Sequence, residues 1–236
     1  MKNDFFHDLY MSIRDVRVRD CSAMSLSHLL HGYLSVYAMV RVSPVLEREY
    51  GTLQEIHERL REIAKELSKT MKDTSIELDE RIGYMADLMD AYQTYSDMDL
   101  LNEALDVAYW VLTVDEKGEI VMPDKTPNVC RLLCNWYYFT GEEWCLEMAE
   151  GIMEECSASI KLQDKSMILM NREYLQLWRT KEIYATVMKD DFCRKMYFES
   201  MYSIDNINQI LEMGIDSMYE KFDRFAKIIY RVKLQS

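Results

Sequence analysis

The chain has 236 residues, of which 49% are hydrophobic and 29% are charged, with only seven glycines and three prolines. This composition is too apolar for a disordered chain, and it holds too few glycines and prolines for the frequent turns of an all-β domain. The formal net charge of −13 disfavours binding to nucleic acid and to an anionic membrane surface, because both require a basic face. We therefore expect a folded, acidic, helical protein.

The charge is unevenly distributed. Residues 73–124 contain 14 acidic side chains and only two basic ones, Arg81 and Lys117, so 2 − 14 = −12 of net charge lies there. The closing stretch 221–236 is basic instead, with five Lys or Arg residues against Asp223. The acidity thus belongs to one segment.

No segment has the pattern of an export signal or a membrane span. The first twenty residues mix charged and apolar side chains, and no apolar run approaches the roughly 18–20 residues needed to cross a bilayer. The six cysteines lack the spacing of a disulfide framework. These features predict a cytoplasmic protein with reduced thiols.

Helical periodicity runs through most of the chain. Apolar residues recur every three or four positions, the period of one helix face. The stretches with this pattern predict eight or nine helices, which cover 24–41, 45–69, 80–95, 99–113, 128–139, 142–156, 166–187, 191–202 and 206–233. A small β-hairpin is predicted within 114–122, where Lys117-Gly118 would form its turn. No linker interrupts the pattern, so we predict a single all-α domain, 1–236.

Local signals mark several helix starts. Thr126-Pro127 is typical of an N-cap followed by proline at the first helical position. Ser96, with Asp99 three residues later, is typical of a capping box.

The chain also repeats itself. A shift of 45 positions aligns apolar residues of 85–108 with later ones, pairing Leu88 with Leu133, Tyr92 with Tyr137, Leu101 with Leu146 and Ala104 with Ala149. The same shift places Cys130 and Cys134 on Met85 and Met89, which predicts buried thiols. Repeated helix–turn–helix units predict an array of about four antiparallel hairpins, followed by a long C-terminal helix.

Two of these units resemble a known superfamily. The segments 84–97 and 140–150 are similar to hairpins of the six-hairpin, (α/α)-toroid superfamily, in which an aromatic-or-Thr, Gly, Asp turn precedes Leu-x-x-Ala. Glycoside hydrolases, sugar epimerases and lanthionine-synthase-like cyclases share this architecture. The resemblance covers residues 80–157, about a third of the chain. A closed toroid has more helices than are predicted here, so the resemblance implies an incomplete one.

The resemblance also directs attention to the connectors between hairpins. In these toroids substrate binds where connectors meet the starts of the inner helices, which correspond here to 73–80, 114–128 and 157–166. The residues it singles out are Glu77, Asp79, Glu80, Asp115, Asp124 and Asn128.

Paired carboxylates are the chemistry that this position would support. Glycoside hydrolysis needs a protonated and an ionised carboxyl roughly 5–10 Å apart. Asp79 or Glu80, together with Asp115 or Asp124, could form that pair, and the nearby Tyr109 and Trp110 could stack on a sugar ring. The competing interpretation is that these are solvated loop acids, favoured at helix starts by the helix dipole.

Other chemistries have weaker support. His28 and His31, at i and i+3, could face one metal ion, but no further ligands lie near them in sequence, so structural histidines are the better interpretation. Nucleophile-elbow and phosphate-binding or dinucleotide-binding glycine motifs are absent from the sequence. We predict neither a metal nor a cofactor.

Two functions remain. The first is a binding or scaffold module whose concave helical face holds a protein, peptide or glycan. The second is a carbohydrate-active enzyme of six-hairpin type that uses connector carboxylates as general acid and base. We favour the first, because the chain is short and no acid pair stands out. The apolar stripe of 206–233 predicts packing on the last hairpin or, alternatively, a homodimer seam.

Overall fold

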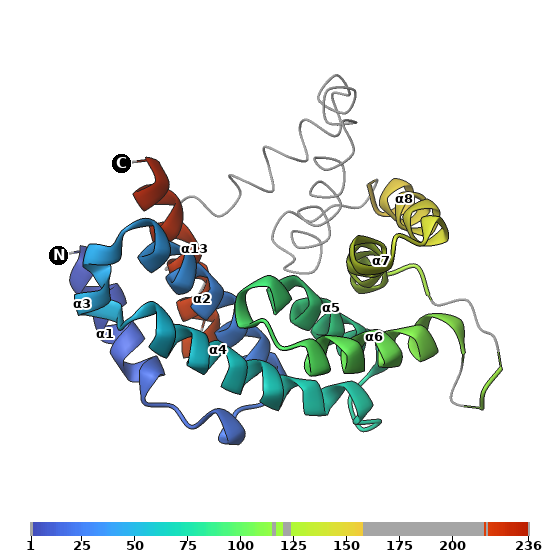
Figure 1. Ribbon diagram of the computed structural model, residues 1–236, viewed down its shortest axis with the longest axis horizontal. Coiled ribbons are helices and arrows are strands. Elements are labelled where there is room, and N and C mark those ends of the chain that lie inside the picture. Colours follow the sequence, from blue (N-terminus) through green and yellow to red (C-terminus); the bar gives the residue numbers. More distant parts are fainter. Residues whose placement is uncertain (1, 115–116, 120–123, 158–214, 216, 236) are drawn as a thin grey trace. The chain divides into compact units, whose positions relative to one another are not determined.

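All the regular secondary structure that the structure describes is helical. A computed structural model describes residues 2–114, 117–119, 124–157, 215 and 217–235, and these form nine α-helices and no strand (Figure 1). The all-α prediction is confirmed for them. The helices are α1 Lys2–Arg14, α2 Ala23–Val42, α3 Glu47–Tyr50, α4 Leu53–Ser68, α5 Leu78–Tyr95, α6 Met98–Thr113, α7 Pro127–Thr140, α8 Glu143–Ser157 and α13 Met218–Gln235. Short 3-10 turns cover Val18–Asp20, Pro44–Leu46 and Lys69–Lys72. The predicted helices 166–187 and 191–202 lie outside the described residues.

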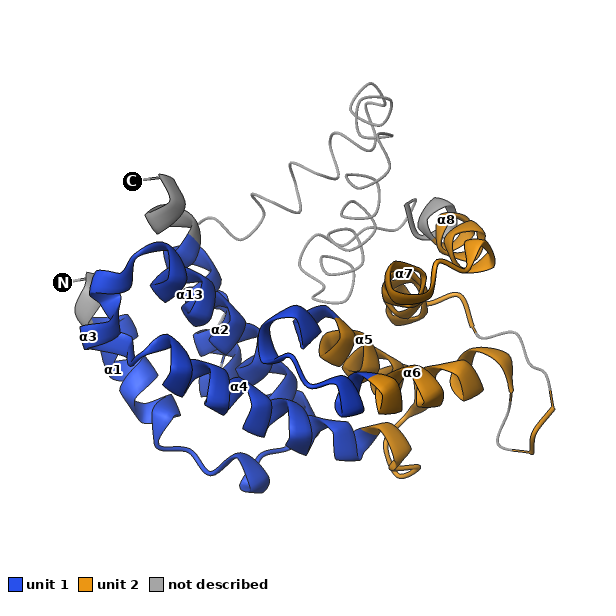
Figure 2. Cartoon of the chain, in the orientation of Figure 1, with its two compact units in different colours: residues 1–70, 90–101, 204–236 blue, residues 71–89, 102–203 orange. Residues whose placement is uncertain are grey.

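Contacts group the chain into two compact units (Figure 2). Unit 1 comprises Met1–Thr70, Asp90–Leu101 and Ile204–Ser236, and unit 2 comprises Met71–Met89 and Asn102–Ser203. Helices α5 and α6 each contribute residues to both units. The single domain, 1–236, stays a prediction.

The N-terminal helix α1 precedes the first helix that the sequence predicted. Its buried side chains are Phe6, Tyr10 and Ile13, at i, i+4 and i+7, which is a helical stripe. The stripe is short and set among charged residues. The segment nevertheless forms a stable helix because α1 packs against α13 and α3 within unit 1.

Helix α13 is shorter than predicted. Ile215 and Ser217 are not helical, so the prediction of one continuous helix over 206–233 is wrong, while residues 206–214 lie outside the described residues. The helix begins at Met218, where the Ser217 side chain accepts the backbone N–H of Glu220 at 3.4 Å. Its apolar face packs against α2 and α1. A homodimer through 206–233 stays a prediction.

A glycine allows α13 to approach α2 closely. A Cβ atom at Gly32 would lie 2.4 Å from Cε1 of Phe222, well inside van der Waals contact. Phe222 enters a cluster of aromatic rings, with centroids 5.4 Å from Tyr33, 6.1 Å from Tyr10 and 6.1 Å from Phe6. This cluster is the centre of the unit 1 core.

A buried polar network also joins α2 and α13. The Nδ1 atom of His28 lies 3.1 Å from Oδ2 of Asp223, and Nζ of Lys227 lies 2.7 Å from the other carboxylate oxygen, Oδ1. His28 and His31 are both buried. His28 therefore has a structural partner across the helix interface. Within the described residues no group of three His, Cys, Asp or Glu side chains could hold a metal ion.

The helix caps confirm one prediction and correct another. The Thr126 side chain accepts the N–H of Val129 at 3.2 Å, with Pro127 at the first helical position, as predicted. At α6 the cap is Asp97, whose Oδ1 accepts the N–H of Leu100 at 3.2 Å. The predicted capping box at Ser96 is wrong, because that residue takes a left-handed conformation (φ 53°) in the turn after α5.

The connector after α6 is described only in part. Lys117 lies in a turn and Gly118 has a φ of 84°, where the hairpin turn was predicted. Residues 115–116 and 120–123 lie outside the described residues, so the β-hairpin itself stays a prediction. Among the described cysteines, Cys130, Cys134 and Cys145 are buried and Cys21 is partly exposed, and no disulfide joins these four. The prediction of buried thiols at 130 and 134 is confirmed.

Candidate functional site

A row of polar contacts joins the first half of α5 to α7 within unit 2. On α5 the positions 79, 83 and 87 are spaced by four residues, so they lie along one face of the helix. On α7 the positions 128 and 131 are spaced by three and also share a face. Three successive contacts between these faces follow from this spacing.

The first contact brings together two residues that the sequence singled out. The Asn128 side chain donates from Nδ2 to Oδ2 of Asp79 at 2.8 Å and to its backbone carbonyl at 3.2 Å. The Thr126 hydroxyl donates to the other carboxylate oxygen of Asp79. Asn128 is only 9% exposed, and Asp79 is partly exposed. Both carboxylate oxygens of Asp79, at the start of α5, thus accept hydrogen bonds from neutral donors at the start of α7.

The second contact is made possible by a glycine. A Cβ atom at Gly83 would lie 3.0 Å from Oδ1 and 3.1 Å from Cγ of Asn128. A side chain at this position would press on the amide that holds Asp79. Gly83 therefore sets the close approach of α5 and α7.

The third contact is a buried ion pair. Nη2 of Arg131 lies 2.6 Å from Oδ1 of Asp87, and each of the two side chains is 3% exposed. The Nη1 atom of Arg131 also donates to the carbonyl of Gly83 at 3.5 Å. Burial, with the nearby carboxylates of Glu80 and Asp87, raises the pKa of Tyr84 to about 12. Its hydroxyl stays neutral beside this pair.

Sequence reasoning missed this ion pair, although a signal existed. Asp87 and Arg131 each interrupt an apolar stretch, and 44 positions separate them, close to the 45-residue repeat. Opposite charges inside two stripes that the repeat aligns are expected to pair, because an isolated buried charge is very costly.

The remaining predicted site residues are dispersed. Glu77, Glu80 and Asp124 are exposed, and the backbone carbonyl of Asp124 accepts the N–H of Thr126 at 2.9 Å. Asp115 lies outside the described residues. No contact recorded in the described part of the chain joins Asp79 to a second carboxylate. The general acid and base pair therefore stays a prediction. The hydrogen bonds among Asp79, Thr126 and Asn128 join the start of α5 to the start of α7.

A second feature of unit 2 is the outer face of α6. Tyr109 is 50% exposed and Trp110 is 58% exposed, whereas Ala104, Ala108 and Leu112 on the inner face are buried. Glu103 and Asp106 are exposed on the outer face as well, one to two turns before the aromatic pair. We call Glu103, Asp106, Tyr109 and Trp110 the α6 outer face.

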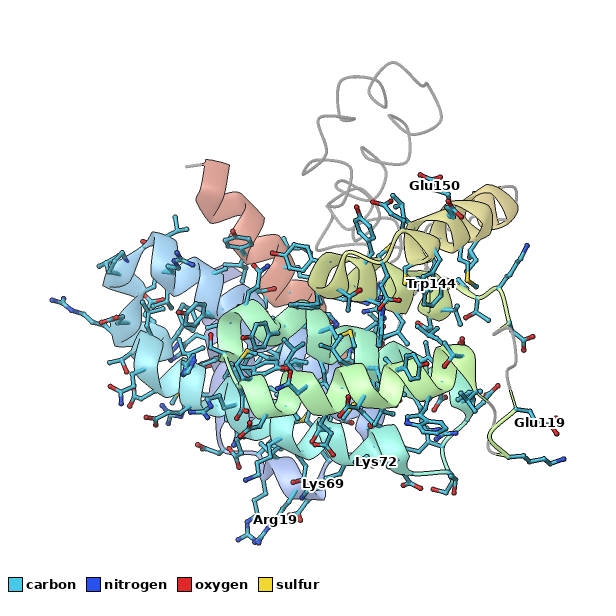
Figure 3. The ribbon with its side chains drawn as sticks, turned by 45° about the vertical axis from the view of Figure 1, so that its right-hand side comes forward. Arg19, Lys69, Lys72, Glu119, Trp144 and Glu150 are labelled. Atoms are coloured by element: carbon cyan, nitrogen blue, oxygen red, sulfur yellow. The ribbon has the colours of Figure 1, made fainter. Side chains whose placement is uncertain are left out.

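Two neighbours contact this face from the same unit. Nζ of Lys72, on the turn after α4, lies 2.8 Å from Oε1 of Glu103. The lysine side chain is 65% exposed and is labelled in Figure 3. The ring of Trp136 lies behind Tyr109, with centroids 6.1 Å apart and planes inclined by 31°. Trp136 is 5% exposed, and its indole nitrogen has no acceptor among the described residues. The α6 outer face thus combines two carboxylates with the ring of Tyr109, which packs on Trp136, and the exposed ring of Trp110.

No protein-family model matches the sequence, and no curated protein or solved structure is significantly similar to it. The resemblance to six-hairpin toroids thus depends on sequence motifs alone. Among the described helices none is by itself both long and apolar enough to cross a membrane, although the bent pair Ala23–Val42 and Pro44–Tyr50 meets the length and composition criteria together.

Proposed function

We propose that this chain is a helical-repeat binding module that holds a protein, peptide or glycan on an exposed face of its helices. The proposal includes an array of about four hairpins, related to an incomplete (α/α) toroid, with a concave binding face. The observation that supports it is the exposure of Tyr109 and Trp110 side by side on α6. Aromatic residues are enriched at binding interfaces, where they supply much of the contact energy.

No packing within the described residues of unit 2 accounts for the exposure of these rings. Small and aliphatic side chains are buried on the inner face of α6, and the Tyr109 ring lies 6.1 Å from the buried Trp136 ring while staying half exposed. Burying a large apolar side chain fully is worth about 1.5–3 kcal/mol, so two half-exposed rings leave considerable stabilisation unused. A partner that covers them would recover it.

Site-specific crosslinking tests the proposal. A photo-reactive amino acid at position 110 should give a discrete covalent adduct in cells that produce the protein, and Tyr109→Ala should weaken it. The matched control places the same amino acid at Glu58, an exposed position of α4. Identical adduct patterns at both positions, or none at 110, would overturn the proposal.

The second candidate is a carbohydrate-active enzyme of six-hairpin type. It is favoured by one observation, the meeting of Asp79 and Asn128 at the starts of α5 and α7. In this proposal Asp79 is one carboxyl, and Asp115 or Asp124 is the other. Asp79→Asn should then abolish turnover of aryl glycosides, while Asp73→Asn, a change at an exposed loop position, should not. Turnover that survives Asp79→Asn would exclude this role.

A further inference from the structure

We infer that the occupant of the α6 outer face is a basic peptide segment of a protein partner, whose Lys or Arg side chains lie over Trp110 and Tyr109 and pair with Glu103 and Asp106. This inference rests on the proposed function and specifies its partner.

The spacing on α6 defines the length of such a segment. Positions 103, 106 and 110 are related by i, i+3 and i+7, so they form one stripe along the helix, and 109 lies beside it. A rise of 1.5 Å per residue makes this stripe about 10 Å long. That length accommodates two basic side chains one helical turn apart on the partner, with each cation between a carboxylate and a ring.

The charge of this region selects a cation. Helix α6 contains no Lys, Arg or His, and Glu103 and Asp106 repel each other at i and i+3. Lys72 offsets Glu103, but no ion pair to Asp106 is recorded within the described residues. The surrounding segment 73–124 has a net charge of 2 − 14 = −12, which attracts a basic segment over a distance and repels an anionic one.

The aromatic pair favours the same ligand. A Lys or Arg cation over the face of an indole or phenol ring is attracted by the ring quadrupole, and Trp is the strongest partner. An arginine can stack on the ring and donate two hydrogen bonds to a carboxylate at the same time. A neutral glycan could stack on the rings but would gain nothing from the charge, so the acidity decides in favour of the peptide.

The ring of Trp136 provides an independent indication of a ligand. The Trp136 ring lies 6.1 Å from the ring of Tyr109, and its indole N–H is buried with no acceptor among the described residues. Buried donors are nearly always satisfied in native proteins. A backbone carbonyl of the bound segment could satisfy this one, once the half-exposed Tyr109 side chain turns aside.

The test uses the full chain and a fluorescent peptide that contains four arginines among Leu, Gly and Ser. Fluorescence anisotropy at low salt, about 50 mM, should give a dissociation constant in the micromolar range, which weakens as salt screens the carboxylates. A peptide with citrulline in place of arginine removes the charge at nearly constant shape. It should bind at least about tenfold more weakly, because the ion pairs and the cation–π contacts are both lost.

Protein variants locate the site. Trp110→Ala and Asp106→Asn should each weaken binding at least about fivefold. Tyr138→Ala removes another half-exposed aromatic ring of unit 2, and Glu58→Gln removes another exposed carboxylate. Both controls should change the affinity less than about twofold. Circular dichroism melting curves establish that each variant is folded.

Each other outcome overturns the inference. Equal binding of the citrulline peptide would exclude recognition of the cation. An equal loss with Glu58→Gln and Asp106→Asn would reduce the binding to nonspecific attraction by the net charge. Binding of a neutral oligosaccharide that depends on Trp110, with no binding of the arginine peptide, would identify a glycan instead. If the arginine peptide does not bind while the crosslink at position 110 persists, this inference is wrong but the proposal of a binding module is retained, with a different partner. If the peptide does not bind and no crosslink forms, the proposed function is wrong as well.

Discussion

The packing of α13 on α2 can be tested at one glycine. Gly32→Ala adds a Cβ atom that would lie 2.4 Å from Cε1 and 2.5 Å from Cδ1 of Phe222. Ordinary carbon–carbon contact is about 3.5–4.0 Å, so the ring must move by about 1 Å. The rings of Phe6, Tyr10 and Tyr33 surround Phe222, with centroids between 5.4 and 6.1 Å away, which restricts that movement.

The expected magnitude is the difference between two effects. Overpacking a well-filled core costs about 1–3 kcal/mol, whereas Gly→Ala inside a helix gains up to about 1 kcal/mol in helix propensity. We expect Gly32→Ala to lower the free energy of unfolding by up to about 2 kcal/mol. Gly151→Ala is the matched control, because nothing lies within 4 Å of a Cβ at that helical position. That variant should gain up to about 1 kcal/mol.

Urea unfolding of both variants, with midpoint and slope fitted separately, provides the measurement. A double-mutant cycle assigns the effect to the contact itself: Phe222→Leu should cost less in the Gly32→Ala background than in the parent, with a coupling of about 0.5–3 kcal/mol. If Gly32→Ala stabilises the protein as much as Gly151→Ala does, or if the cycle is additive, then Phe222 does not pack on Gly32 and the reasoning is wrong.

Three further predictions concern single side chains. Asp87→Asn should lower the free energy of unfolding by about 3–5 kcal/mol, because it removes the negative charge 2.6 Å from the buried Arg131 guanidinium. A smaller cost for the double change Asp87→Leu with Arg131→Met would support this cause, and an unchanged urea midpoint for the single variant would contradict it. The hydrogen bond from Arg61 holds the pKa of Asp97 below its ordinary value, so the stabilisation is present at neutral pH and is lost as the pH falls from about 4 through the folded-state pKa. The Asp97→Ala variant should start about 1 kcal/mol less stable, and its unfolding midpoint should fall less than that of the parent between pH 6 and 3. An equal decrease of the midpoint with pH in both proteins would refute the assignment. Burial, with a smaller contribution from a nearby carboxylate, raises the pKa of the Cys145 thiol to about 12. Iodoacetamide at pH 8 should therefore label Cys145 only after the protein is unfolded. Peptide mapping that finds Cys145 labelled in the native protein would be inconsistent with this burial.

Periodicity located most described helices because burial follows it. The helix predicted over 24–41 is α2, Ala23–Val42, and the one predicted over 99–113 is α6, Met98–Thr113. Aligned positions of the repeat such as Leu88 and Leu133 are both buried. A helix with a continuous apolar face must bury that face, so its period is visible before any partner is known.

Capping and short helices depended on geometry that the sequence leaves open. Ser96 and Asp97 are both good cap residues, and the turn after α5 decides between them by placing Ser96 in a left-handed conformation. The buried stripe of α1 is too short to distinguish from chance. It forms a helix because α13, far away in the chain, supplies the other side of its core.

For the candidate sites too, some features are visible in the sequence and others depend on the tertiary structure. The sequence by itself determined that the chain is helical, that its acidity is concentrated in one segment, and that Asp79, Asn128, Tyr109 and Trp110 belong to that segment or its edge, since composition and spacing are local properties. Only the tertiary structure decided what these residues do to one another. It held both oxygens of Asp79 with neutral donors, placed Asp87 on Arg131, and left two rings of the acidic helix uncovered, because pairing across helices depends on which faces meet. The net charge of −13 led us to expect no nucleic-acid partner, and on the α6 outer face the same negative charge is the property by which we expect a basic partner to be recognised.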